Sequence, residues 1–133
     1  MNKVNYWAIA VAAVITLLAS SVYYTVFGGL WQSMRPDAAA ASAPQAWEVI
    51  GQLGRNVVEI LVLAVLMRRL NITTWLAAVR LGLLVWVGFQ AIAVAGSVLH
   101  ENYPVGLFAL HIGDALMTTL IAVSVLAAWR RPA

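Results

Sequence analysis

The sequence has no cysteine and little charge. The absence of cysteine excludes disulfide bonds, thiolate metal sites and thiol redox chemistry. Only 10% of the 133 residues are charged, whereas soluble domains carry about 25%. Apolar residues make up 63% of the chain, and the mean hydropathy is +0.88. These values exclude an ordinary soluble domain and indicate an integral membrane protein.

Four long apolar segments occupy most of the chain, at residues 5–27, 47–67, 75–99 and 105–129. Each reaches the roughly 20 residues that a helix needs to cross the hydrocarbon core. The first is longer than the roughly 7 to 15 apolar residues of a signal peptide, so we expect it to be retained. The sequence therefore predicts an all-α fold, a polytopic membrane four-helix bundle that forms a single transmembrane domain over residues 1–133. The loop over residues 28–46 is of low complexity and is predicted to be mobile.

Positive charge is concentrated at the ends of these segments. In a four-span topology, one side holds Arg35 as its loop cation. The other side holds five cations: Lys3, Arg68, Arg69, Arg130 and Arg131. Because cytoplasmic loops carry an excess of Lys and Arg, both termini are predicted to be cytoplasmic. Orientation in the membrane thus explains the net charge of +3, and no nucleic-acid partner is expected.

Asp114 is the single full charge in the last segment, and His111 lies three residues before it. A carboxylate near the middle of the bilayer costs about 2.5 to 3.5 kcal/mol on insertion scales, so Asp114 needs an inward-facing partner. We count depth from the non-cytoplasmic end of each span at about 1.5 Å per residue. By this count Arg55, Glu59 and Gln90 lie at depths similar to that of Asp114. We therefore predict that Asp114 pairs with Arg55.

The second segment carries polar residues at intervals of three and four. They are Gln52, Arg55, Asn56 and Glu59. This spacing places them on one helical face, which is expected to point inward. Thr16 and Ser20 of the first segment fall in the same outer half of the membrane. All four helices could therefore contribute to one polar layer.

The predicted layer has a definite chemistry, with His111, Asp114, Glu59 and Arg55 as candidate catalytic residues. His111 could carry protons between the carboxylates, while Arg55 could stabilise developing negative charge. A buried network that only fixes helix register is the structural alternative. A metal site is disfavoured because one histidine lies in the spans and Arg55 would repel a cation. No metal and no cofactor is predicted.

Four stretches of the chain carry a family resemblance. They are residues 5–13 (NYWAIAVAA), 23–31 (YYTVFGGLW), 86–89 (WVGF) and 104–116 (PVGLFALHIGDAL). The last is the most specific, since it contains His111, Gly113 and Asp114 in the order His-x-Gly-Asp. With these stretches the chain resembles a family of small four-span, mainly bacterial membrane proteins catalogued as domain of unknown function 1761. The resemblance implies a multi-pass protein of the bacterial plasma (inner) membrane, and it implies no activity.

Three functions remain open. The first is a bundle that binds, and could convert by acid/base chemistry, a small amphipathic or lipid-like ligand in a polar-floored pocket within the membrane. The candidate lining residues are Asn56, Gln52, Gln90, Trp86, Phe89, Phe108, Ser20 and Thr16.

The second function is that of a proton- or ion-coupled transporter or channel subunit. It requires a homo-oligomer, because one four-helix protomer is too thin to enclose a wide pore. The third is that of an accessory or assembly subunit of a membrane complex. Membrane lipids are expected partners in every case.

Overall fold

The structure is a computed structural model that describes residues 5–29, 46–101 and 104–129. Its helices are α1 (Tyr6–Val26), α3 (Ala46–Arg69), α4 (Trp75–Val85), the π-helix η2 (Trp86–Ala91), α5 (Ile92–His100) and α6 (Val105–Ala128). Because α4, η2 and α5 are continuous, they form one span over Trp75–His100. The described ranges thus contain four helices long and apolar enough to cross a membrane, which confirms the predicted all-α fold. Most of the predicted mobile loop, 28–46, lies outside the described residues.

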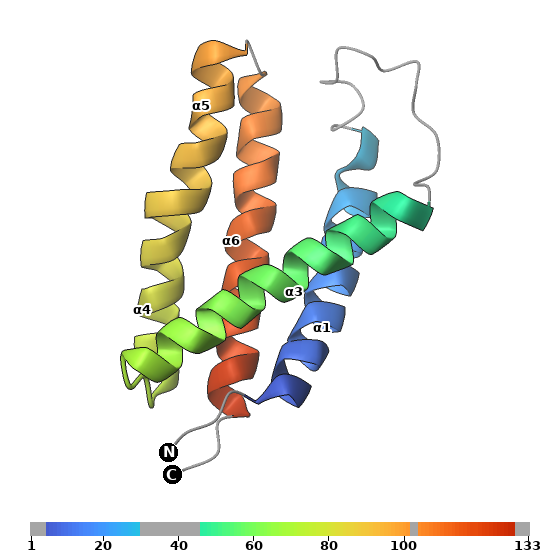
Figure 1. The fold of residues 1–133 in the computed structure, drawn as a ribbon. Coiled ribbons are helices and arrows are strands. Elements are labelled where there is room, and N and C mark those ends of the chain that lie inside the picture. The colour runs from blue at the N-terminus through green and yellow to red at the C-terminus, as the bar shows by residue number, and fades with distance from the viewer. Residues whose placement is uncertain (1–4, 30–45, 102–103, 130–133) are drawn as a thin grey trace.

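Asn5 connects the beginning of α1 with the end of α6. Its side-chain oxygen accepts hydrogen bonds from the backbone N–H groups of Trp7 and Ala8, at 3.1 and 3.2 Å, and so caps α1. Its Nδ2 donates to the carbonyl oxygen of Trp129 at 3.3 Å. The two described chain ends therefore lie at the same end of the bundle, as an even number of spans requires (Figure 1).

The reversal between α3 and α4 depends on Asn71, which has a positive φ of 54°. Asn71 and Ile72 donate their N–H groups back to the carbonyls of Arg68 and Met67, at 3.2 and 2.9 Å. This is the bonding pattern of a Schellman motif, which satisfies carbonyls that the end of a helix leaves free. The sequence Asn71-Ile72 therefore ends α3 sharply and directs the chain into α4.

The helix α6 lies at the centre of the bundle, with α1 on one side and the third span on the other (Figure 1). In contrast, α3 runs obliquely across α1 and α6 and reaches α4 with its C-terminal end. A tilted helix gains less depth per residue than an upright one. The depths that we derived for Arg55 and Glu59 from the full helical rise are therefore too large.

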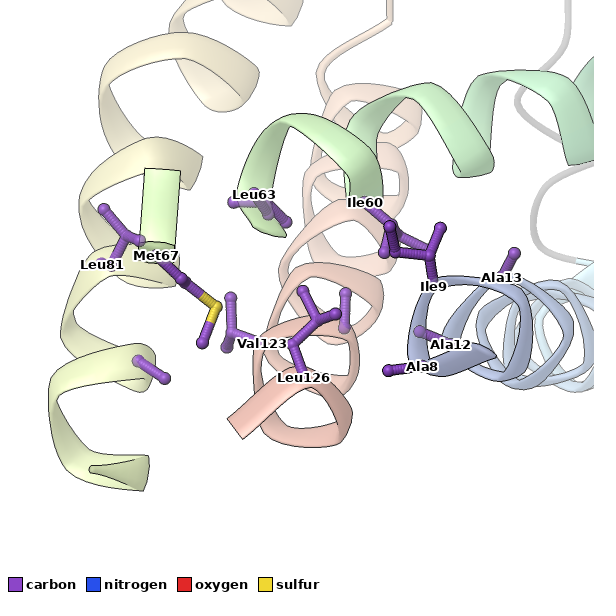
Figure 2. Packing of buried hydrophobic residues seen from close by; sticks show 12 residues of the cluster. Ala8, Ile9, Ala12, Ala13, Ile60, Leu63, Met67, Leu81, Val123 and Leu126 are labelled. Carbon is purple, nitrogen blue, oxygen red and sulfur yellow. The ribbon is translucent and has the colours of Figure 1, made fainter. Parts of the chain in front are cut away.

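The apolar core lies where the oblique helix crosses the others. Figure 2 shows Val123 and Leu126 of α6 between Met67 on one side and Ala8 on the other. A Cβ atom added to Gly82 would lie 3.2 Å from Cγ2 of Val123, so this glycine brings α4 close to α6. Because lipid tails are as apolar as these side chains, close packing rather than water exclusion holds the helices together. The core occupies the half of the bundle that carries the described chain ends.

Candidate functional site

Hydrogen bonds join α1 and α6 at successive turns beyond the core. Ser20 Oγ donates to Oδ1 of Asp114 at 2.7 Å. About one turn further on, the hydroxyl of Tyr24 and Nδ1 of His111 lie 2.7 Å apart and share a hydrogen bond whose direction follows the imidazole tautomer. The polar residues of α1 recur at i and i+4, and those of α6 at i, i+3 and i+7, so each set follows one helical face. We call this row the polar column; its members are Thr16, Ser20, Tyr24, His111, Asp114 and Thr118.

Gly113 makes room for a further contact in the interface between α1 and α6, which we call the seam. The hydroxyl of Tyr23 donates to the carbonyl oxygen of Leu110 at 2.8 Å. A Cβ atom on Gly113 would lie 2.7 Å from this hydroxyl oxygen, closer than van der Waals contact allows. The glycine between His111 and Asp114 therefore lets the tyrosine reach the backbone of α6.

The polar column leads to a half-open pocket between α1, α3 and α6. The space between its lining atoms is about 230 Å³ when the open solvent at its mouth is included. It is lined by Thr16, Asn56, Glu59, Ile60, Leu63, Thr118, Thr119 and Ala122. Its wall thus combines one carboxylate, one amide and three hydroxyl groups with three apolar side chains.

A chain of hydrogen bonds from Arg55 to Ala13 orients Asn56, the amide that lines the pocket. Arg55 Nη1 donates to Gln52 Oε1 at 3.1 Å, and Gln52 Nε2 donates to Asn56 Oδ1 at 3.0 Å. Asn56 Nδ2 then donates to Thr16 Oγ1 at 3.3 Å, and Thr16 donates to the carbonyl oxygen of Ala13 at 3.0 Å. Gln52, Asn56 and Thr16 each accept from one neighbour and donate to the next, so this chain fixes the orientation of both amides.

Glu59 lies on the same face of α3 but takes no part in these hydrogen bonds. Its side chain is exposed and lines the pocket. Within the part of the chain that the structure describes, no hydrogen bond and no ion pair is made by its carboxylate. Arg55, one turn away, turns instead toward Gln52. The pocket therefore contains a carboxylate that none of the described residues neutralises by direct contact.

The predicted ion pair between Arg55 and Asp114 is not formed. Both residues are described, yet Asp114 accepts from Ser20, and Arg55, exposed on α3, donates to Gln52. The reason is the oblique course of α3, which places α1, rather than α3, along the seam beside Asp114. The polar residues thus do not form the single layer that we predicted. They form the polar column along α1 and α6 and a pocket at the end of that column where Thr118 lies.

The π-helix η2 brings two of the predicted residues to α6. Gln90 Oε1 accepts from Thr119 Oγ1 at 2.8 Å, and so supports the wall of the pocket from behind. Trp86 Nε1 donates to the carbonyl oxygen of Ile112 at 2.8 Å. Six residues with π-helical bonding change the register of the span and let both side chains face α6.

The predicted aromatic wall does not line this pocket. Phe89 is 73% exposed and points away from the bundle, and Phe108 is half-buried near the beginning of α6. Ile60, Leu63 and Ala122 form the apolar wall instead. Among the residues described, no cluster of three or more His, Cys, Asp or Glu side chains could hold a metal ion.

Sequence reasoning missed Thr118, Thr119 and the role of Tyr24. Thr118 follows Asp114 by four residues, so extending the His111–Asp114 face by one turn would have found it. A tyrosine near the end of a span is typical of an anchor at the membrane boundary, but the hydroxyl of Tyr24 is a partner of His111.

Comparisons with known proteins give one match. A family model described as "Protein of unknown function (DUF1761)" matches residues 7–127. No curated protein and no solved structure matches the chain. The matched range includes both the polar column and the pocket.

Proposed function

We propose that this chain, which belongs to the DUF1761 family, binds the polar group of a small amphipathic or lipid-like molecule in the pocket between α1, α3 and α6. Its four apolar helices make it a multi-pass membrane protein, and the proposed location is the plasma (inner) membrane of a bacterium. The observation that carries the proposal is Glu59, a carboxylate in a pocket with an apolar wall, to which the described residues supply no direct partner.

The position of the pocket favours an amphipathic ligand. With about 1.5 Å of rise per residue, Thr16 and Thr119 lie roughly 15 Å from the bundle end at Asn5 and Trp129. That is about half of the hydrocarbon thickness of ~30 Å. A molecule that reaches this depth through the open side of the pocket must pass apolar surroundings, so it needs an apolar part.

The polar groups of the pocket favour a hydrogen-bond donor as the ligand group. The hydroxyls of Thr16, Thr118 and Thr119 each donate to an oxygen of the protein, namely to Ala13, Ala115 and Gln90. What remains for a ligand is mainly acceptor capacity on these hydroxyl oxygens and on Glu59. A hydroxyl or amino group suits this site, and it would also supply the partner that an intramembrane carboxylate requires.

The volume limits how much of the ligand the pocket can take. Its enclosed part has room for about one water-sized group, because most of the 230 Å³ is solvent at the open mouth. It accepts a single hydroxyl or amino group of a head group, not a whole lipid. The apolar tail would lie outside the mouth, against apolar side chains such as Val62, which is exposed on α3 three residues after Glu59.

The test is mass spectrometry of the small molecules that copurify with the protein from membranes. We expect a donor-bearing amphiphile with the parent chain and at least a tenfold loss with Glu59→Gln, since tenfold corresponds to about 1.4 kcal/mol. The matched control is Glu101→Gln, because Glu101 is exposed in the turn after α5 and far from the pocket in sequence.

Equal retention by Glu59→Gln, Glu101→Gln and the parent chain would overturn the proposal. The complete absence of copurified amphiphile would favour the accessory-subunit function instead. The same native spectra report the oligomeric state, and a homo-oligomer is what the transporter alternative requires.

A further inference from the structure

The polar column and the pocket meet at Thr118. Thr118 lies one turn beyond Asp114 on α6, and its side chain lines the pocket together with Glu59. We propose that the polar column is a one-sided proton path that connects the bundle end at Tyr24 with Glu59.

The spacing of the groups suits proton transfer through single water molecules. By helical rise, His111 and Asp114 are about 4.5 Å apart along the axis, and Asp114 and Thr118 about 6 Å apart. A bridging water spans two polar groups at such separations. Ser20 and Tyr24 hold the carboxylate and the imidazole in place from α1, at 2.7 Å in both cases.

The path is closed on the other side of the pocket. The next residues toward the described chain ends belong to the apolar core, including Leu63, Val123 and Leu126. Figure 2 shows these side chains directed into the region between the helices. Water chains need polar partners, and this half of the bundle offers none among its core residues. Protons can therefore reach Glu59 from the Tyr24 end and not from the Asn5 end.

Few titratable side chains near Glu59 can bind a proton during the transfer. On α3 the neighbouring charge is Arg55, and on α6 the titratable groups are His111 and Asp114. The remaining titratable groups on the helices packed against α3 are Tyr6, Tyr23 and Tyr24 of α1 and the exposed Arg80 of α4. Of these side chains, only the imidazole and the carboxylates exchange protons readily near neutral pH.

The proposed transfer conserves charge and needs no electrons. A proton from water at the Tyr24 end binds the imidazole of His111, which passes it to the carboxylate of Asp114. Asp114 releases it to the water beside Thr118, and an O–H bond forms on Glu59. His111 and Asp114 return to their starting states, so the net change is one proton taken from one aqueous side and bound by Glu59.

Protonation would also change what the pocket binds. This consequence, unlike the path itself, rests on the proposed function. A neutral Glu59 has lost an acceptor and gained a donor, so it no longer suits a hydroxyl or amino group. Acid on the Tyr24 side is therefore expected to release the ligand.

The path is tested with the purified full chain in liposomes, with the orientation determined by protease access to a terminal tag. An acid jump is applied to one side, and infrared difference spectra follow the carbonyl band of a protonated carboxyl. The band of Glu59 is the one that disappears in Glu59→Gln. We expect this band after acidification of the Tyr24 side only.

Variants of the polar column report whether the proton passes through His111 and Asp114. Asp114→Asn and His111→Gln are expected to slow the appearance of the Glu59 band roughly 100-fold or more. Ser21→Ala is the matched control, because Ser21 neighbours Ser20 but is exposed and donates to Leu17 of its own helix at 2.8 Å. A response to acid on either side, or an unchanged rate in both column variants, would overturn the path.

A second measurement leaves all charged residues unchanged and tests from which side water reaches the path. Because the chain has no cysteine, single substitutions Thr118→Cys and Ala12→Cys can be probed with a small hydrophilic thiol reagent. We expect labelling of Thr118→Cys from the Tyr24 side and none of Ala12→Cys, since Ala12 is fully buried in the core. Labelling of Ala12→Cys, or of Thr118→Cys from the Asn5 side, contradicts a one-sided path.

Failure of the path and failure of the proposed function give different results. Asp114→Asn should keep the copurified amphiphile and lose the fast Glu59 band. A parent chain without any amphiphile but with a one-sided Glu59 band would refute the binding function and leave the path intact.

Discussion

The hydroxyl of Ser20 lies 2.7 Å from Oδ1 of Asp114 and donates a hydrogen bond to it across the α1–α6 seam. Ser20 is buried, and Asp114 is half-buried. The carboxylate at this depth therefore takes its direct partner from the first helix, not from an arginine.

Removal of this hydroxyl should destabilise the protein. Ser20→Ala leaves one lone pair of a half-buried carboxylate unsatisfied, and we expect a loss of about 1 to 3 kcal/mol in the free energy of unfolding. Ser21→Ala is the control and should stay within about 0.5 kcal/mol of the parent chain. Unfolding in detergent measures both, and equal losses in the two variants would refute the Ser20–Asp114 bond.

The bond from Asn56 to Thr16 should appear as an energetic coupling between α3 and α1. Hydrogen bonds between membrane helices average roughly 0.6 kcal/mol and reach about 1.7 kcal/mol. We expect a coupling in this range from a double-mutant cycle of Asn56→Leu and Thr16→Val. The same cycle with Thr25→Ala should be additive, because Thr25 is exposed and bonds to Ser21. A coupling of zero in the first cycle would argue against the contact.

A methyl group at position 113 should displace Tyr23. Gly113→Ala places a Cβ atom 2.7 Å from the tyrosine hydroxyl, so the bond to Leu110 must lengthen or break, at a cost of about 0.5 to 1.5 kcal/mol. Gly96→Ala provides the comparison, since nothing lies within 4 Å of its added Cβ. The intrinsic helical gain of alanine is common to both variants. Gly113→Ala should therefore be the less stable of the two in thermal unfolding, and the reverse order would be inconsistent with the structure.

Both termini are expected in the cytoplasm. The prediction follows from the sequence, in which five cations fall on the side of the two termini and Arg35 falls on the other side; the five are Lys3, Arg68, Arg69, Arg130 and Arg131. Tags at the two termini can be tested for accessibility to an external protease in intact cells. Digestion of either tag from outside would reverse the orientation, and with it the membrane side to which the polar column opens.

The four helices could be predicted because apolar length is a property of the local sequence. The shared faces were also predictable: Gln52 and Asn56 are spaced i, i+4, and they do bond to each other. The partner of Asp114 could not be predicted, because the depth count assumed that all four spans stand upright in the membrane. The tilt of α3 depends on packing against α1 and α6, which residue periodicity does not encode.

Other parts of the site had a weak signal or none. Tyr24 near a span end has the same pattern whether its hydroxyl faces the membrane boundary or His111. The π-helix at Trp86–Ala91 differs from an α-helix in its bonding, and its composition is that of any apolar span. Gln90 was predicted to line the pocket, but it bonds to Thr119 of the pocket wall instead, and the π-helical turn that directs it there has no sequence signal.

The seam between the first and the last helix sets the order of events during synthesis. The Ser20–Asp114 bond joins residues 94 positions apart, and the Asn5–Trp129 bond joins residues 124 positions apart. While the ribosome is still producing α6, α1 is already in the bilayer with Ser20 and Thr16 lacking their α6 neighbours. Since helices insert before they associate, the bundle closes only when the final span arrives. A nascent chain released after α5 would lack the α6 half of the seam, and it would present quality-control proteases with an unassembled membrane protein.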